Sequence, residues 1–170
     1  MLVRLMGVLV VSVGILAAAF FGLTKQYTVR SDAMAPTLRK GDHVAVFRFW
    51  STFSSPHRKD VVVFRPEAFT FRRCGKGAIV DRVIGLPGET VSERNGFVSV
   101  DGKALKEPYV KAGHRDARTA AWHVPKGEYF LLGDDRRTNC DSRTDGPIPK
   151  KNIVGKVFLT FWPFDRVSVG

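Results

Sequence analysis

The hydrophobic and polar positions divide the chain into one long apolar run followed by many short alternating runs. The long run, Leu5–Leu23, holds 19 residues without a charge. As a helix it would extend about 28 Å, close to the roughly 30 Å of hydrocarbon in a bilayer. The pattern therefore predicts a transmembrane anchor over residues 1–25. The alternative is a cleaved signal peptide with its small-residue site at 17–19, but the apolar run continues past that site.

Beyond residue 24 no stretch has convincing helical periodicity. The apolar runs are short, rich in β-branched and aromatic residues, and separated by Gly, Pro and small polar residues, which is typical of strands and turns. The sequence predicts an all-β domain over 26–170. Its expected strands are 26–29, 43–49, 60–64, 78–84, 90–93, 97–100, 122–124, 129–132 and 153–161.

The middle of the chain predicts a set of hairpins. An Asn-Gly pair at 95–96 separates two alternating runs, and this pair favours a tight two-residue β-turn. An Asp-Gly pair at 101–102 predicts a second turn. The polar residues that follow are weakly patterned, so we expect a small hairpin insert at about 93–127.

Charge and cysteine content narrow the function classes. Lys and Arg number 27 against 16 Asp and Glu, a formal net charge of +11. The basic residues are scattered and no nucleic-acid motif accompanies them, which favours an anionic membrane or envelope over nucleic acid. Cys74 and Cys140 fit either one disulfide or two separate buried thiols. Their spacing matches no metal motif, and no cofactor is expected.

Three separated segments carry the chemistry, and they occur in a familiar order. Residues 31–38 read Ser-Asp-Ala-Met-Ala-Pro-Thr-Leu, residues 81–89 read Asp-Arg-Val-Ile-Gly-Leu-Pro-Gly-Glu, and residues 133–143 read Gly-Asp-Asp-Arg-Arg-Thr-Asn-Cys-Asp-Ser-Arg. These segments resemble the boxes of type I signal peptidases. Together with 146–149, 153–156 and 161–163, the resemblance covers nearly the whole chain, anchor included.

The resemblance implies a fold and a reaction. The fold is two antiparallel β-sheet regions with the hairpin insert as a smaller cap. The reaction is hydrolysis of exported precursors after small residues, outside the cytoplasmic membrane, by a Ser/Lys dyad. In that dyad a buried, neutral Lys takes the proton of the Ser nucleophile.

At the positions that carry this chemistry the chain departs from the family pattern. The nucleophile position is Ala33, the general-base position is Asp81, and the position that supports the base is Asn139. Ser31 matches the hydroxyl that supports the oxyanion. All three altered residues are expected in one cluster, and the mechanism needs both a nucleophile and its base.

The supporting residues of the boxes remain. Arg82, Asp141 and Arg143 match positions of structural support, the last two as an ion pair. The sequence therefore predicts a catalytically silent family member that binds exported or pilin-like polypeptides and contacts the lipid of the cytoplasmic membrane. The pilin-like client is expected because homologues of the family that lack the dyad take part in pilus assembly.

Two alternatives stay open. The chain could be an active signal peptidase rewired around Ser31 with Asp81 as base, although a carboxylate near its usual pKa of ~3.9 accepts a hydroxyl proton poorly. We expect Arg82 or Arg143 to lower that pKa further, and the plainer interpretation of Asp81 is a member of an ion pair. The chain could instead be a basic envelope protein that binds anionic polymers or lipid.

Aromatic residues near the anchor predict a surface that rests on the bilayer, although aromatic residues in strands also pack in cores. They are Phe47, Phe49, Trp50, Phe53, Phe161 and Trp162.

Overall fold

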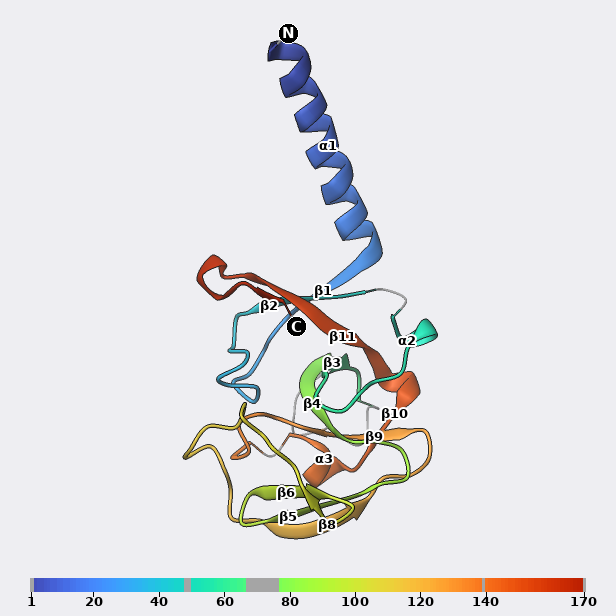
Figure 1. Ribbon diagram of the computed structural model, residues 1–170, viewed down its shortest axis with the longest axis vertical. Helices are drawn as coiled ribbons and strands as arrows, with labels where there is room; N and C mark the ends of the chain where they lie inside the picture. Colours follow the sequence, from blue (N-terminus) through green and yellow to red (C-terminus); the bar gives the residue numbers. More distant parts are fainter. Residues whose placement is uncertain (1, 48–49, 67–76, 139, 170) are drawn as a thin grey trace.

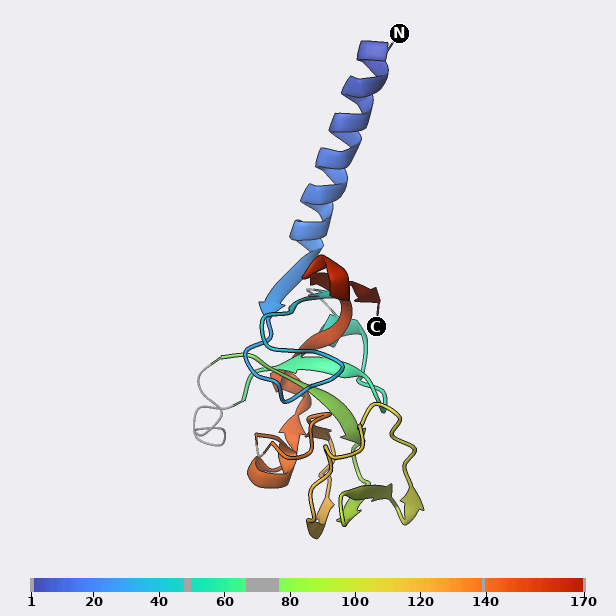
Figure 2. The same ribbon diagram turned by 90° about the vertical axis from the view of Figure 1, so that its left-hand side faces the viewer.

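The computed structural model describes residues 2–47, 50–66, 77–138 and 140–169. The first element is a straight helix, α1 (Leu2–Leu23), which extends away from the rest of the molecule (Figure 1 and Figure 2). Leu9, Val10 and Phe21 on this helix are exposed. By length and apolarity, none of the helices in the described ranges qualifies as a membrane span, so the predicted transmembrane anchor is not confirmed.

The remainder is built from antiparallel strands, which confirms the predicted all-β class. The larger sheet has eight strands in the order β1-β2-β11-β3-β4-β9-β10, and β12 pairs with β11 outside this path. Its strands are β1 (Thr24–Thr28), β2 (His43–Phe47), β3 (Val61–Phe64), β4 (Ile79–Gly85), β9 (Glu128–Leu132), β10 (Ile148–Pro149), β11 (Ile153–Trp162) and β12 (Ser168–Val169).

The insert forms a separate sheet of four strands in the order β7-β6-β5-β8, which we call the cap sheet. It lies at the end of the molecule opposite α1 (Figure 1). Its strands are β5 (Thr90–Arg94), β6 (Phe97–Val100), β7 (Lys103–Ala104) and β8 (Thr119–His123).

Both predicted hairpin turns of the cap sheet are confirmed. Arg94 pairs with Phe97, so Asn95 and Gly96 form the two-residue turn, with φ of 51° and 76°. Positive φ at both central positions is what the right-handed twist of a tight hairpin requires, and Asn-Gly supplies it at low cost. A Cβ atom at Gly96 would also lie 2.4 Å from the carbonyl oxygen of Asp116, which leaves room for glycine alone.

Buried apolar side chains join the two sheets through β4 and β9. Ile84, Phe130 and Leu132 from the larger sheet pack with Val91 and Val98 of the cap sheet. Two further clusters fill the larger sheet on either side of β3, one around Val44 and Met34 and one around Phe64 and Leu131. Because both faces of β3 and β4 are covered, their side chains are almost all buried.

Short helices are the main departure from the predicted secondary structure. Trp50–Phe53 forms α2 and Ser142–Asp145 forms α3, each of four residues, with 3-10 turns at Lys150–Asn152 and Phe164–Arg166. Single turns of this length cannot display a helical repeat of hydrophobic residues, so the pattern along the sequence does not reveal them.

Candidate functional site

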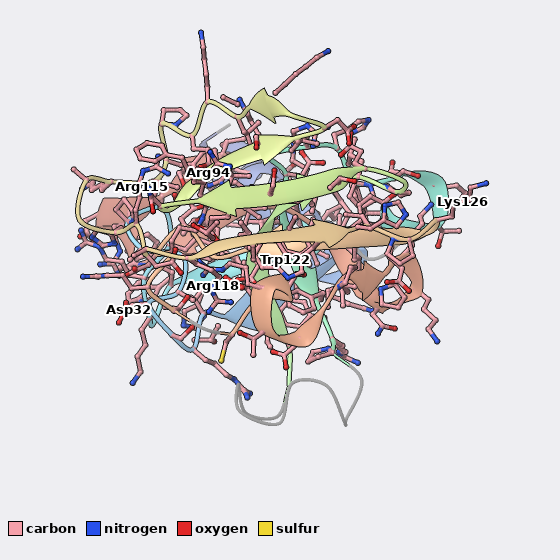
Figure 3. The ribbon with its side chains drawn as sticks, turned by 90° about the horizontal axis from the view of Figure 1, so that it is seen from below. Asp32, Arg94, Arg115, Arg118, Trp122 and Lys126 are labelled. Carbon is pink, nitrogen blue, oxygen red and sulfur yellow. The ribbon has the colours of Figure 1, made fainter. Side chains whose placement is uncertain are left out.

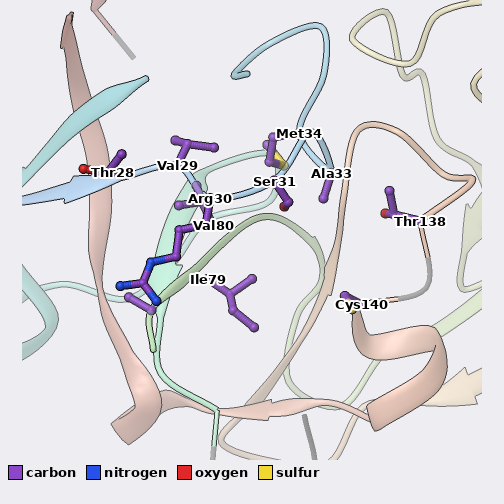
Figure 4. A pocket seen from close by; sticks show the side chains of 11 residues that line it. Thr28, Val29, Arg30, Ser31, Ala33, Met34, Ile79, Val80, Thr138 and Cys140 are labelled. Carbon is purple, nitrogen blue, oxygen red and sulfur yellow. The ribbon is translucent and has the colours of Figure 1, made fainter. Parts of the chain in front are cut away.

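A pocket of about 330 Å³ opens between the segment after β1 and the beginning of β4, and we call it the Ala33 pocket (Figure 4). Ser31 and Ala33 lie towards the side of Thr138 and Cys140, and Thr28 and Arg30 lie towards the opposite side. Its lining is more apolar than polar, and consists of Thr28, Val29, Arg30, Ser31, Ala33, Met34, Ala78, Ile79, Val80, Thr138 and Cys140.

The backbone around Ala33 is held closely against the loop after β9. The carbonyl oxygen of Ala33 accepts a hydrogen bond of 2.9 Å from the backbone N–H of Asp135. A Cβ atom at Gly133 would lie 2.6 Å from that same oxygen, so this approach requires glycine. The next residue, Met34, is 1% exposed and packs in the core. Ala33 therefore presents a methyl group to the pocket from a fixed backbone.

Asp81 lies on β4, fully buried, and neither of its carboxylate oxygens has a hydrogen-bond partner among the described residues. Burial raises its pKa well above the ordinary 3.8, and the nearby carboxylates of Asp141 and Asp134 raise it further. Arg143 acts in the opposite direction and is outweighed. The expected net lowering of this pKa by arginine is wrong, because desolvation dominates. The interpretation of Asp81 as an ion-pair member finds no support among the described residues, where no cation contacts its oxygens.

Arg82, the residue after Asp81, points into a fully partnered network. Its Nε lies 2.7 Å from Asp134 Oδ1 and its Nη2 lies 2.6 Å from Asp134 Oδ2, a bidentate pair. The Thr37 hydroxyl donates to the same carboxylate at 2.5 Å, and Arg82 Nη1 donates to the Lys59 carbonyl at 2.9 Å. The guanidinium also lies 4.0 Å from the centre of the Tyr109 ring.

A second network surrounds Arg143 at the start of α3. Arg143 Nη2 lies 2.7 Å from Asp141 Oδ2 and donates to the Thr138 carbonyl at 2.8 Å. Asp141 also caps α3 by accepting the backbone N–H of Arg143 at 3.0 Å. Arg143 Nη1 reaches Asp116 Oδ2 at 3.0 Å and Glu93 Oε1 at 3.6 Å. Burial raises the pKa of Glu93 to about 7 despite this cation.

Asp134 is the supporting residue that the sequence-based reasoning left without a role. It lies 52 positions from Arg82, so no local pattern joins them. Charged residues in otherwise apolar stretches of the sequence could have indicated buried ion pairs, since buried charges need partners. The same signal would have indicated Arg136, fully buried and paired with Glu107.

Of the remaining candidate site residues and cysteines that the sequence analysis singled out, the structure describes Ser31 and Cys140. Ser31 is exposed and lines the Ala33 pocket, but it makes no hydrogen bond to Asp81, whose oxygens have no hydrogen-bond partner in the described part of the chain. Asn139 and Cys74 lie outside the described residues. Cys140 is disulfide-bonded and lines the same pocket. Across the described ranges no three His, Cys, Asp or Glu side chains converge to hold a metal ion.

Comparison with known proteins decides the family. The sequence profile of the family described as signal peptidase, peptidase S26, matches residues 2–162. The chain belongs to the signal peptidase I family. It is 36% identical to signal peptidase I of Leptolyngbya laminosa over 142 residues, covering 82% of this chain and 70% of that one. It is 36% identical to signal peptidase I V of Bacillus subtilis strain 168 over 146 residues, covering 77% and 82%.

The fold agrees with this family. A signal peptidase I crystal structure from Enterococcus faecalis V583 superposes with a TM-score of 0.51 at 29% sequence identity, over 61% of this chain and 97% of that one. The antiparallel β architecture described above is therefore that of a signal peptidase I.

Proposed function

We propose that this signal peptidase I relative is catalytically silent and holds exported polypeptides in an extended conformation beside Ala33. The observation that carries the proposal is the state of the two positions that the reaction needs: a methyl group at Ala33 faces the pocket, and the buried carboxyl of Asp81 has no hydrogen-bond partner among the described residues. Peptide hydrolysis by this family's mechanism needs a nucleophile and a base that can take its proton. Ala33 supplies no nucleophilic atom.

The state of Asp81 argues against its serving as a base. Burial raises the pKa of Asp81 well above its ordinary value and so favours the protonated carboxyl, which accepts no proton from a hydroxyl. Ser31 as a substitute nucleophile would need Asp81 within hydrogen-bonding reach, directly or through water. Ser31 lines the pocket, whereas Asp81 does not, so the rewired alternative lacks the contact that it needs.

The strand pairing supports polypeptide binding. β4 pairs with β3 over Ile79–Arg82 but with β9 only from Arg82 onward. Along Ile79–Asp81, the second edge of β4 therefore has no partner among the described strands. Ala78, Ile79 and Val80 line the pocket at this edge. An extended peptide can add a strand to such an edge through backbone hydrogen bonds, which require no nucleophile.

We further propose that residues 1–25 anchor the protein and that the domain of residues 26–170 acts on the extracytoplasmic side, where exported or pilin-like clients emerge. α1 has 22 residues, a length of about 33 Å at 1.5 Å per residue. Where α1 ends, Leu23, Phe47, Trp50 and Phe53 line an apolar hollow. Exposed apolar side chains at this end of the domain are suited to contact with membrane lipid.

The test of this function is a binding measurement with the detergent-solubilised full chain and a fluorescein-labelled peptide containing an Ala-x-Ala segment. We expect saturable binding without cleavage, and loss of binding in Ala78→Trp, because the indole would fill the pocket at the free edge of β4. The matched control is Ala112→Trp, an exposed alanine of the insert, which should bind normally. Equal binding by both variants would contradict the proposed site.

A further inference from the structure

The Ala33 pocket continues into a second hollow of about 340 Å³, which we call the Arg65 pocket. The two adjoin because Thr28, Arg30 and Ala78 line both. The second hollow lies on the side away from Ala33, and it is lined by Gln26, Tyr27, Thr28, Arg30, Arg65, Gly77 and Ala78.

The charges of this continuous groove have one sign. Of the lining residues that the structure describes, Arg30 and Arg65 are the charged ones, and no Asp or Glu is among them. Figure 4 shows Arg30 extending away from Ala33. Its guanidinium packs against Gly77, where a Cβ atom would lie 2.9 Å from Nη1. The groove thus has a neutral end at Ala33 and a cationic end at Arg65.

Arg65 combines a fixed backbone with an exposed side chain. It follows β3 directly, and its backbone N–H donates to the Asn152 carbonyl at 2.8 Å. Its side chain makes no hydrogen bond or ion pair with any described residue. An exposed guanidinium on this fixed backbone can meet a carboxylate in the planar, bidentate geometry that arginine favours.

We propose that the groove selects extended polypeptides that carry an Asp or Glu side chain on one side of the segment bound at Ala33, and that Arg65 determines this selectivity. The inference rests on the proposed function, since it names the class of polypeptide that the same groove takes. A bound chain that runs from Ala33 towards β1 passes Arg30 and then Arg65. An acidic side chain there replaces solvent as the partner of the guanidinium.

The expected effect is modest because Arg65 is exposed to solvent. An ion pair of this kind changes binding by about 2- to 5-fold, and added salt weakens it. The selectivity therefore has to be measured with peptides that differ in one side chain.

The experiment compares labelled Ala-x-Ala peptides that carry Glu, Gln or Lys at each position on either side of that segment, by fluorescence anisotropy with the solubilised full chain. At one position we expect the Glu peptide to bind about 2- to 5-fold more tightly than the Gln peptide. Arg65→Glu should reverse this order so that the Lys peptide binds best. The control is Arg94→Glu on the cap sheet, an exposed arginine remote from the groove, which should leave the ratio unchanged (Figure 3).

Three outcomes would overturn the inference, and they can be told apart. If Glu and Gln peptides bind equally at every position, the acidic selectivity is absent while the peptide-binding function stands. If no peptide binds, the proposed function fails and the selectivity with it. If Arg65→Glu instead weakens binding to phosphatidylglycerol vesicles and leaves the Glu-to-Gln ratio at one, Arg65 recognises lipid and not polypeptide.

Discussion

Two groups of residues in the site differ in whether their side chains have polar partners. Arg82, Asp134, Asp141 and Arg143, which we call the ion-paired frame, are buried and joined by bidentate contacts. The side chains of Ala33 and Asp81, which we call the central pair, make no hydrogen bond to any residue that the structure describes. Replacing one member of a buried ion pair would destabilise the fold, because the other charge would remain buried without a partner. The central pair carries no ion pair of this kind, so the fold of the site does not depend on it in the same way.

The largest expected effect comes from breaking the frame. Arg143→Ala should lower the free energy of unfolding by about 3–5 kcal/mol, because Asp141 would remain buried without its cation. Chemical denaturation of the detergent-solubilised protein measures this change. Arg137→Ala is the control, since Arg137 pairs with Asp135 from an exposed position and should change stability little. If both variants lost the same free energy of unfolding, the buried ion pairs of the frame would be no more important for stability than an exposed pair.

The second prediction concerns the buried acid of the central pair. The folded protein keeps the proton of Asp81 to a higher pH than the unfolded chain, in which its pKa is near 3.8. Stability conferred by this group is therefore complete below that pH and is lost as pH rises towards the folded-state pKa. In Asp81→Asn the loss is absent, so its stability relative to the parent should grow by about 1.4 kcal/mol per pH unit.

Denaturant unfolding between about pH 5 and pH 8 tests this difference. The pKa of Glu93, raised to about 7, produces a slope of the same sign in both proteins, which cancels in the comparison. The control is Asp101→Asn, an exposed turn residue at φ 48° that Asn also tolerates. Parallel curves for Asp81→Asn and the parent would show that Asp81 is ionised in the folded state.

The smallest expected effect comes from restoring the missing hydroxyl alone. Ala33→Ser should change the free energy of unfolding by less than about 1 kcal/mol, since the new hydroxyl faces a pocket that can hold water. It should also yield no peptide cleavage, because burial raises the pKa of the carboxyl at the base position and disfavours the carboxylate that would take the proton. Thermal unfolding and a cleavage assay on the same preparation measure both. Cleavage by this single variant would contradict the assignment of Asp81 as unable to serve as base.

The sequence predicts the strands and hairpins well because their signals are local. The short apolar run of β2 and the Asn-Gly turn at 95–96 depend on neighbouring residues alone. The state of Asp81 could not be predicted in this way. Its pKa depends on burial and on two carboxylates from the loop after β9, more than fifty positions away. The sequence indicates that arginine is near, but only the fold shows that desolvation outweighs it.

The most direct test of the account is a cleavage assay with the detergent-solubilised full chain and a precursor that bears an Ala-x-Ala site, analysed by mass spectrometry. We expect no product from the parent chain, and product only when Ala33→Ser, Asp81→Lys and Asn139→Ser are combined, because the nucleophile, its base and the base's support are then all present. Product from the parent chain that disappears in Ser31→Ala would contradict the account and establish a rewired peptidase.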